Sequence, residues 1–337
     1  MHALSGHFKD APAHPLGLCS SVAAGGLSLL VAIVPLAAQG AIDPNVAPRA
    51  AALEREGERH MAIDLLGRYL ATAPDDGRAW LQLGRFYLSD ARDWHVHGHR
   101  SEPDGMLYLD FAATALEQAI RLSVDSGVIF RGVAELERAQ ATMEEVGWGP
   151  ARSSLDRTRA PRMPSFVIEL GENLLASCPA GGVLLTGGEL EALSVWYGTL
   201  AEPSLDVLPI RPDLYATDSL YRLRMAQAMD VDPGLPVQRA LGDVAPRRTL
   251  CLSPGADSAA APVSAWMPYR LVRVSRPASP DPQAMSITEL LKAVRQNPSA
   301  WVVEVRGVYD RAAAHNPMLC SSLLLLFGDT PPPACQP

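Results

Sequence analysis

The stretch CPAGGVLLTGGELEALSVWY, residues 178–197, decides how the fold of this chain is interpreted. A short apolar run at 183–185 lies between two pairs of glycines. An amphipathic segment at 189–197 follows, and it opens with two acidic residues, Glu189 and Glu191. This order predicts a buried strand, a tight turn and a helix. We interpret it as the first strand–helix unit of a small α/β domain.

Strands and helices are predicted to alternate through the surrounding residues. The expected helices are 166–178, 189–200 and 212–229, and the expected strands are 183–185, 205–208, 248–252 and 268–274. Such alternation predicts a mostly parallel sheet with helical crossovers. We therefore place a small α/β domain at residues 165–276, preceded by a basic, proline-containing linker at 151–164.

Further helices are predicted in the C-terminal region, residues 284–337. One begins at Ser286, with Glu289 placed as its capping-box partner. Others are expected at 300–314 and 318–327, before a proline-rich tail. We expect these helices to pack on the α/β domain or on the helices that precede it.

The composition indicates a globular, acidic protein. Hydrophobic residues make up 48% of the 337-residue chain and charged residues 20%, which favours folding over disorder. The formal net charge is -8, and the arginines are scattered among acidic residues. An acidic chain without a basic stripe repels phosphate backbones, so we expect no nucleic-acid partner.

The N-terminal residues 1–42 form a separate segment that carries no charge from 11 to 42. An apolar run at 27–36 followed by small residues is typical of a secretory signal peptide. The alternative is an uncleaved membrane anchor, because 16–38 is long enough to span a bilayer. Either interpretation places the remainder outside the cytoplasm, and we expect a periplasmic protein anchored to the inner membrane.

Residues 43–150 have the apolar spacing of helices. The residues that set the register are Ala62, Pro74, Trp80, Leu83, Gly84 and Tyr87. This set resembles the tetratricopeptide repeat, in which helix pairs stack and offer a surface to protein partners. The resemblance implies that Trp80 is a core side chain between packed helices. A generic bundle of helical hairpins is the alternative interpretation.

The repeat pattern breaks at residues 92–105, which we interpret as an inserted loop that docks a partner. The candidate contact residues are Arg92, Trp94, His95 and Arg100, since tryptophan and arginine are enriched in interface hot spots. In an extended segment His95, His97 and His99 would point to one side, where Asp93, Glu102 or Asp104 could complete a zinc or copper site. We expect a polar surface loop and no metal.

A second resemblance covers about a third of the chain. The sequence GVLLTGGE at 182–189, Glu191 and VWY at 195–197 occupy the places of a hallmark in bacterial protein O-mannosyltransferase-like membrane proteins. Segments at 216–221 and 267–272 match that family in part. The resemblance implies the fold of its extracytoplasmic C-terminal module and an association with membrane machinery. It does not imply transferase activity, because two glutamates replace the paired aspartates and the sequence shows no multi-pass bundle.

The α/β region shows no recognisable catalytic motif. It lacks a G-x-G-x-x-G turn, a Walker lysine and a nucleophile elbow. Glu189 and Glu191 at a helix start are explained by the helix dipole. A paired-carboxylate acid–base site is the alternative. We expect no enzymatic activity and no cofactor.

Cysteine placement suggests disulfide bonds, since an oxidising compartment favours pairing. Cys320 and Cys335 are the favoured pair, because their bond would tie the tail to the last helix. Cys178 and Cys251 flank expected strands and are either a second pair or buried thiols.

These features together predict a non-enzymatic, membrane-associated extracytoplasmic scaffold or accessory subunit. Its expected partners are protein subunits of a larger membrane complex, which it would brace. The alternative is an accessory protein of an envelope glycosylation or polysaccharide system, following the second resemblance.

Overall fold

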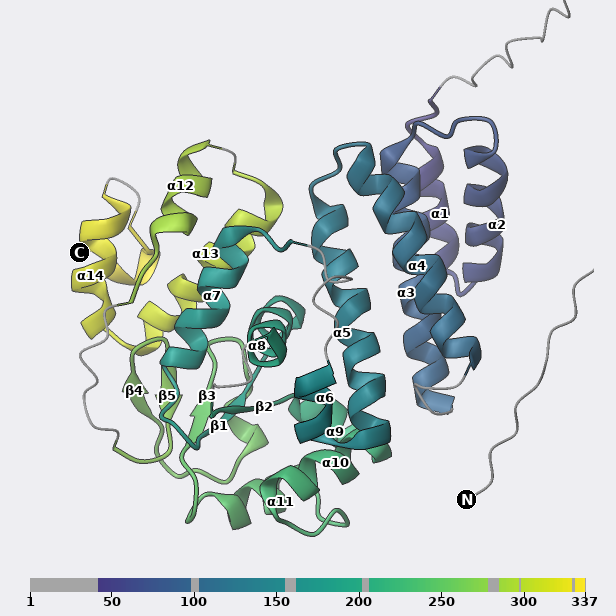
Figure 1. The fold of residues 1–337 in the computed structure, drawn as a ribbon. Helices are drawn as coiled ribbons and strands as arrows, with labels where there is room; N and C mark the ends of the chain where they lie inside the picture. The colour runs from purple at the N-terminus through teal and green to yellow at the C-terminus, as the bar shows by residue number, and fades with distance from the viewer. Residues whose placement is uncertain are drawn as a thin grey trace, which may run out of the picture. The chain divides into compact units, whose positions relative to one another are not determined.

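The computed structural model describes residues 42–97, 103–154, 162–201, 206–277, 285–296, 298–328 and 331–336. In this part of the chain, the fold class predicted from the sequence is confirmed. A helical region comes first, a small mixed sheet with its own helices follows, and C-terminal helices come after it (Figure 1).

The helices before the sheet are α1 (Val46–Arg55), α2 (Arg59–Leu70), α3 (Gly77–His97), α4 (Pro103–Arg121), α5 (Ser126–Val146) and α6 (Trp148–Ser154). Asp76 starts α3, because its Oδ1 accepts hydrogen bonds from the backbone N–H groups of Arg78 and Ala79 at 3.0 and 3.1 Å. Gly84 allows α3 and α4 to approach closely, since a Cβ there would lie 2.6 Å from Cγ of Leu116. Small residues therefore set the spacing of this antiparallel pair.

Residues 92–105, predicted as an inserted loop, are helical wherever the structure describes them. Helix α3 continues to His97 and α4 begins at Pro103. Ala91 on α3 and Leu109 on α4 are buried in the same cluster, so the ends of the two helices pack together. The loop prediction is therefore wrong for residues 92–97 and 103–105, because the buried face of α3 continues into its packing against α4.

Trp80 is not the buried core side chain that the repeat resemblance implied. Ala79, Leu83 and Phe86 are the buried residues of this part of α3. The Trp80 indole is half-buried, and its Nε1–H donates a hydrogen bond to the carbonyl oxygen of Pro74 at 2.8 Å. The indole therefore covers the turn between α2 and α3 instead of filling the space between helices.

The sheet contains β1 (Val183–Leu185), β2 (Leu208–Ile210), β3 (Leu250–Leu252), β4 (Met267–Tyr269) and β5 (Val272–Val274), in the order β2-β1-β3-β5-β4. β1 pairs in parallel with β2 and β3, whereas β5 pairs antiparallel with β3 and β4. The predicted single strand at 268–274 is a tight hairpin. It reverses at Arg270, whose φ of 50° lies in the left-handed region.

Helices cover both faces of the sheet, as the parallel crossovers require. Helices α7 (Ser165–Ala176) and α8 (Glu189–Ala201) lie on one face, and α9 (Pro212–Thr217), α10 (Ser219–Met229) and α11 (Val237–Val244) lie on the other (Figure 1). The predicted single helix at 212–229 is broken at Asp218. Its carboxylate caps α10 by accepting hydrogen bonds from the N–H groups of Leu220 and Tyr221.

The C-terminal helices are α12 (Thr288–Gln296), α13 (Ala300–His315) and α14 (Met318–Phe327), and short 3-10 turns occur at η1 (Ser258–Ala260) and η2 (Pro333–Cys335). The capping box predicted for α12 does not form. Glu169 of α7 instead accepts hydrogen bonds from the N–H groups of Glu289 and Leu290, at 3.1 and 2.9 Å. Helix α12 is therefore capped by the helix on which it docks.

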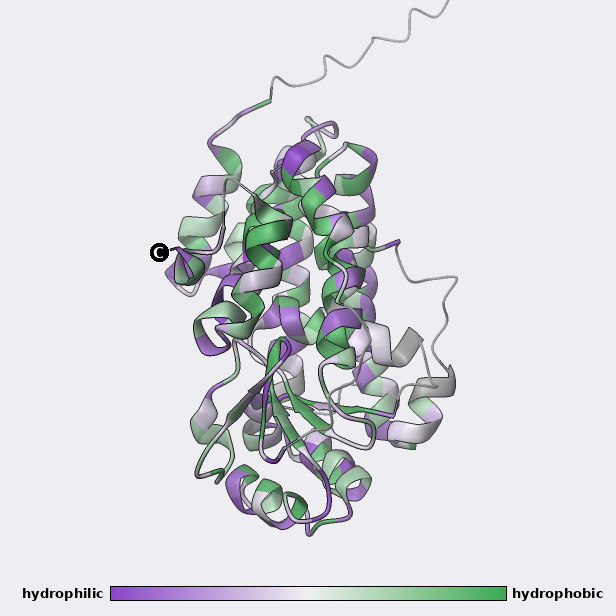
Figure 2. Ribbon diagram, turned by 90° about the vertical axis from the view of Figure 1, so that its left-hand side faces the viewer, coloured by the Kyte–Doolittle hydropathy of each residue, from purple (hydrophilic) through white to green (hydrophobic). Residues whose placement is uncertain are grey.

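Two hydrophobic clusters hold the described residues together. The smaller, which we call the repeat cluster, comprises Val46, Ala50, Ala62, Leu66, Leu70, Ala79, Leu83, Phe86 and Ala115. The larger, which we call the main core, extends from Leu88 through the sheet to Cys335. Helix α6 lies partly in the predicted linker, and its Trp148 packs edge-on against Trp196 of α8, with ring centroids 5.2 Å apart. Figure 2 shows the strands of the sheet as largely hydrophobic, with mixed helices around them.

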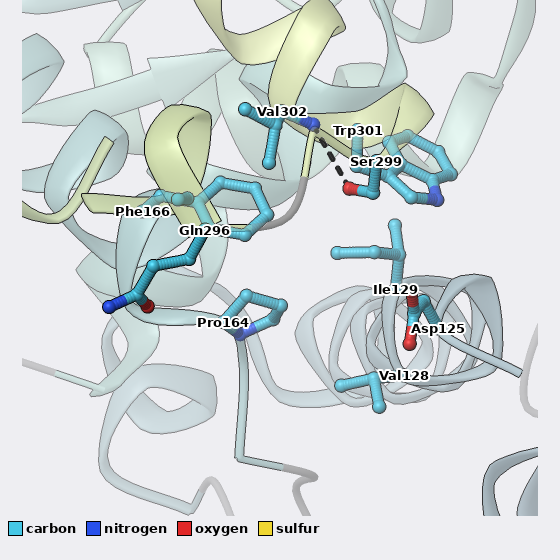
Figure 3. Close-up of a pocket in the computed structure, with 10 residues that line it drawn as sticks. Asp125, Val128, Ile129, Pro164, Phe166, Gln296, Ser299, Trp301 and Val302 are labelled. Atoms are coloured by element: carbon cyan, nitrogen blue, oxygen red, sulfur yellow. Dashed lines mark hydrogen bonds between the residues drawn. The ribbon is translucent and has the colours of Figure 1, made fainter. Parts of the chain in front are cut away.

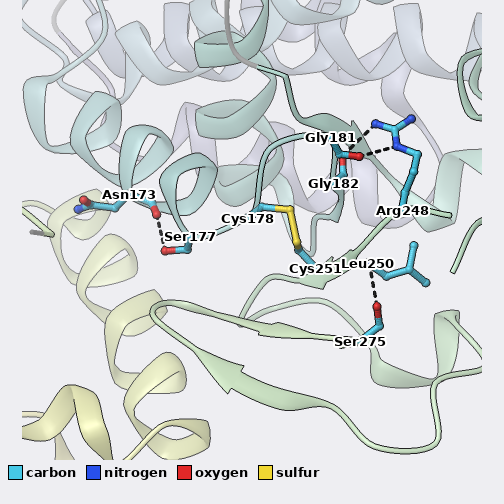
Figure 4. Close-up of a disulfide and its surroundings, with 9 residues drawn as sticks. All are labelled: Asn173, Ser177, Cys178, Gly181, Gly182, Arg248, Leu250, Cys251 and Ser275. Carbon is cyan, nitrogen blue, oxygen red and sulfur yellow. Dashed lines mark hydrogen bonds between the residues drawn. A yellow bond between two sulfur atoms is a disulfide. The ribbon is translucent and has the colours of Figure 1, made fainter. Parts of the chain in front are cut away.

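Both disulfide bonds considered from the sequence are present. The favoured bond, Cys320–Cys335, is confirmed, and Cys178–Cys251 is the second pair, with Cα atoms 5.8 Å apart. The second bond joins the end of the α7 segment to the middle of β3 (Figure 4). Beside it, the guanidinium of Arg248 donates hydrogen bonds to the carbonyl oxygens of Gly181 and Gly182. The start of β1 is therefore fixed both covalently and by hydrogen bonds.

Candidate partner-binding surfaces

The contact residues predicted from the sequence lie at the end of helix α3 or beyond it. Arg92, Trp94 and His95 are in the last turns of α3, and Arg100 lies outside the described residues. Trp94 is half-buried, and its Nε1 has no hydrogen-bond acceptor among the residues that the structure describes. Arg92, Trp94 and His95 therefore belong to a helix and not to the predicted loop, and whether they bind a partner stays a prediction.

The geometry expected for a histidine metal site is also wrong for this part of α3. The metal-site hypothesis assumed an extended segment, whereas the backbone of His95 and His97 belongs to helix α3. His99 lies outside the described residues. Among the positions that are described, no group of three histidine, cysteine, aspartate or glutamate side chains is arranged to hold a metal ion.

Arg92 is engaged inside the molecule. Its Nε donates to Glu137 of α5 at 2.9 Å, and its Nη2 donates to Glu189 of α8 at 2.6 Å. Burial acts to lower the pKa of Arg92, but the charges of Glu137 and Glu189 outweigh it and raise the pKa. Arg92 thus joins three helices, and its charge is already neutralised by carboxylates of its own chain.

The carboxyl edge of the parallel strands carries a buried acid that sequence reasoning missed. Oε2 of Glu191 accepts hydrogen bonds from Oγ of Ser253 at 2.5 Å and from the N–H of Gly255 at 3.2 Å. Its Oε1 accepts from Nη2 of Arg311 at 3.2 Å. Burial raises the pKa of Glu191, while these three partners oppose that rise. The glycines on both sides of this edge were the available sequence signal.

Open α/β sheets bind ligands in the crevice at this edge, where the chain switches from one side of β1 to the other. Here two loops of the protein approach each other closely at this edge. A Cβ on Gly187 would lie 2.0 Å from the carbonyl carbon of Gly255, and a Cβ on Gly255 would lie 2.7 Å from Oε1 of Glu191. The glycines allow the two loops to touch beside the Glu191 carboxylate. Glu191 therefore ties α8 to the β3 loop and to α13.

An exposed apolar surface lies on the outer side of α3 and α4. Leu107 and Phe111, one turn apart on α4, are 47% and 43% exposed. The Phe111 ring contacts Tyr87 of α3, with ring centroids 5.3 Å apart. We call Tyr87, Leu107 and Phe111 the aromatic patch. Large apolar side chains grouped on a surface are typical of binding sites.

A pocket of about 310 Å³ lies where α5, α7, α12 and α13 meet (Figure 3). It is lined by Asp125, Val128, Ile129, Pro164, Phe166, Ala293, Gln296, Ser299, Trp301 and Val302. The Trp301 indole donates a hydrogen bond to Oγ of Ser126 at 3.0 Å, which fixes one wall. The size and the mostly apolar lining are those of a ligand or side-chain pocket.

In the described part of the chain, no helix has both the length and the hydrophobicity to span a membrane. The N-terminal segment at 1–42 falls almost entirely outside the described residues, so the structure does not test its predicted role.

Comparison with known proteins supports one of the two resemblances. A family model for the tetratricopeptide repeat matches residues 47–86, which span α1, α2 and the first half of α3. No curated protein and no solved structure matches the chain. The comparisons give no support to the resemblance to mannosyltransferase-like proteins. The first helix pair and the start of α3 therefore carry a tetratricopeptide repeat, a unit that commonly mediates contacts between proteins.

Proposed function

We propose that this protein is a non-enzymatic scaffold that braces a membrane protein complex through its repeat helices. The observation that carries the proposal is the aromatic patch of Tyr87, Leu107 and Phe111, next to the recognised repeat. Aromatic side chains dominate the energetics of protein interfaces, because they bury large area at low cost in conformational entropy. A partner helix or loop would cover this patch.

The engagement of Glu191 at the carboxyl edge of the sheet supports a scaffold over an enzyme. Glu191 is 2% exposed, and its carboxylate accepts hydrogen bonds from Ser253, Gly255 and Arg311. A catalytic carboxylate must reach a substrate atom within hydrogen-bond distance. Glu189 is likewise engaged, because it pairs with Arg92.

Placement outside the cytoplasm, at the inner membrane, is part of the same proposal. It is supported by the uncharged N-terminal stretch and by the two disulfide bonds, which persist in oxidising compartments. The alternative function is an accessory role in an envelope glycosylation or polysaccharide system. The sequence GVLLTGGE at 182–189 is the feature that favours it.

Affinity purification of the full chain from detergent-solubilised membranes tests the proposal. We expect a fixed set of membrane subunits to co-purify with the wild type and to be lost from a Leu107→Ser, Phe111→Ser double variant. The matched control is Val303→Ser, which replaces an exposed apolar residue on α13. Retention of the same subunits by the double variant would contradict the proposal. A bound glycan or polyprenyl lipid in their place would favour the alternative.

A further inference from the structure

The pocket between α5 and α13 has walls that are fixed by the protein's own contacts. Phe166 and Pro164 face Ile129 and Val128 across the opening, and Trp301 lies at one side (Figure 3). The N–H of the Trp301 indole donates a hydrogen bond to Oγ of Ser126, which favours this position of the ring at the side of the pocket. The pocket is therefore pre-formed, which reduces the entropy that an occupant must lose on binding.

The polar groups of the lining differ in whether they are already engaged. Oγ of Ser299 accepts a hydrogen bond from the N–H of Val302 at 3.3 Å, where it caps α13. Asp125 sits at the start of α5, but its carboxylate does not cap that helix. Among the residues that the structure describes, we find no hydrogen bond or ion pair to this carboxylate. Asp125 is thus an exposed acid at an apolar pocket with an acceptor available to an occupant.

The charges around the pocket favour a cationic occupant. Among the described residues of the lining, Asp125 is the one that carries a charge. Two basic side chains on α3 and α12 contact groups of their own chain: the Arg85 guanidinium lies over the Phe130 ring at 4.9 Å, and Nζ of Lys292 is 3.9 Å from Oε2 of Glu289. Aromatic faces attract cations, and the walls here include Phe166 and Trp301. Phe130, which contacts Trp301 edge-on, already holds Arg85 in this way.

We propose that this pocket receives a lysine or arginine side chain from a protein partner. The aliphatic stem would lie along Ile129, Phe166 and Trp301, and the charged end would reach the Asp125 carboxylate at the opening. Long basic side chains bind in this way because the stem is apolar while the end needs a polar partner. This inference rests on the proposed scaffold function, since the occupant belongs to another protein. It adds a second contact site, which shares no residue with the aromatic patch.

A direct binding experiment on the purified full chain tests the pocket. Two pools of acetylated, amidated pentapeptides are immobilised, with leucine, valine, proline or phenylalanine at the outer positions. The central residue is lysine in one pool and norleucine, which has a similar apolar side chain without the charge, in the other. Surface plasmon resonance should show that the immobilised lysine pool retains at least about tenfold more of the protein than the norleucine pool does. A tenfold difference corresponds to one charge-assisted contact.

Variants show whether the peptides use this pocket. Asp125→Asn should reduce retention by the lysine pool about tenfold, whereas Asp104→Asn, an exposed acid on α4 outside the lining, should leave it unchanged. Ala293→Leu should reduce retention by filling the pocket. Equal retention by both pools, no retention by either, or full retention by Asp125→Asn would overturn the pocket assignment. None of these results would alter the purification test, which depends on Leu107 and Phe111.

Discussion

The repeat cluster and the main core differ in how their residues reach one another. The repeat cluster joins α1, α2 and the first half of α3, which are neighbours in sequence, and takes Ala115 from α4. The main core joins α4 and α5 to the sheet and to helices as distant in sequence as α13 and α14. Repeat units are stabilised mainly by contacts with the next unit, so the first pair depends on few side chains. We infer that the repeat cluster opens more easily than the main core.

The link between the two clusters is narrow and partly polar. Tyr87 packs against both. Arg59 at the start of α2 pairs with Asp90 at 3.0 Å and with Asp93, both on α3. Asp93 is 63% exposed, so its pair with Arg59 contributes little stability, whereas the Arg59–Asp90 pair is partly buried. The two regions can therefore differ in stability although helix α3 runs through both.

The largest effect is expected for a change in the main core. Trp196 is fully buried between Trp148 and Tyr221, so Trp196→Ala leaves a large cavity and should cost about 3–5 kcal/mol. Urea denaturation followed by circular dichroism should show a lower midpoint for the whole transition. A variant as stable as the wild type would show that α8 is not part of the core described here.

A comparable deletion in the repeat cluster should have a local effect. Leu66 on α2 is fully buried. Leu66→Ala should lower the stability of the repeat cluster by about 2–4 kcal/mol, because it leaves a cavity there. Hydrogen exchange should accelerate in α1 and α2 while protection of β1 and β3 stays unchanged. If the strands lose protection to the same extent, the two clusters are one cooperative unit and the comparison fails.

The ion pairs of Arg92 sharpen the comparison, because they lie where α3 leaves the repeat and enters the main core. Arg92→Ala leaves the Glu137 carboxylate, only 4% exposed, without this cation. We expect the free energy of unfolding to fall by about 1–2 kcal/mol. The effect is no larger because Arg92 itself is 36% exposed, and solvent screens its ion pairs. Chemical denaturation measures the loss, and Arg68→Ala, from an exposed pair on α2, is the control. Equal effects of both variants would contradict the internal role of Arg92.

The smallest expected effect is a pH dependence of the main core. Burial holds the pKa of Glu191 above its ordinary value of 4.5, so the folded protein takes up a proton there more readily than the unfolded chain. Lowering the pH through the raised pKa toward 4.5 should stabilise the wild type relative to Glu191→Gln. Urea midpoints of both proteins at pH about 7.5 and about 5 give this difference. A difference that stays constant or moves the other way would contradict the burial of an ionised Glu191.

Local patterns were enough to predict much of the fold. The apolar run at 183–185 is β1, and the predicted helix at 318–327 matches α14. The Cys320–Cys335 bond followed from its place between a helix and a tail. Residues close in sequence determine such elements, so their spacing is sufficient.

The missed features depend on partners that are distant in sequence. Glu191 is buried because Ser253 and Arg311 come to it from other elements. The end of α3 is helical because α4 covers its apolar face, although WHVHGH is polar and rich in histidine. The pocket is formed by residues from 125 to 302 and has no local signature.

Native-state hydrogen exchange on the full chain tests the central comparison most directly. Amides in α1 and α2 should exchange through an opening whose free energy is lower than that of β1, β3 and α8, by at least about 2 kcal/mol. Leu66→Ala should lower the free energy of this opening, whereas Trp196→Ala should leave it unchanged. A single opening free energy shared by all these elements would contradict the account, because the repeat would then have no stability separate from the main core.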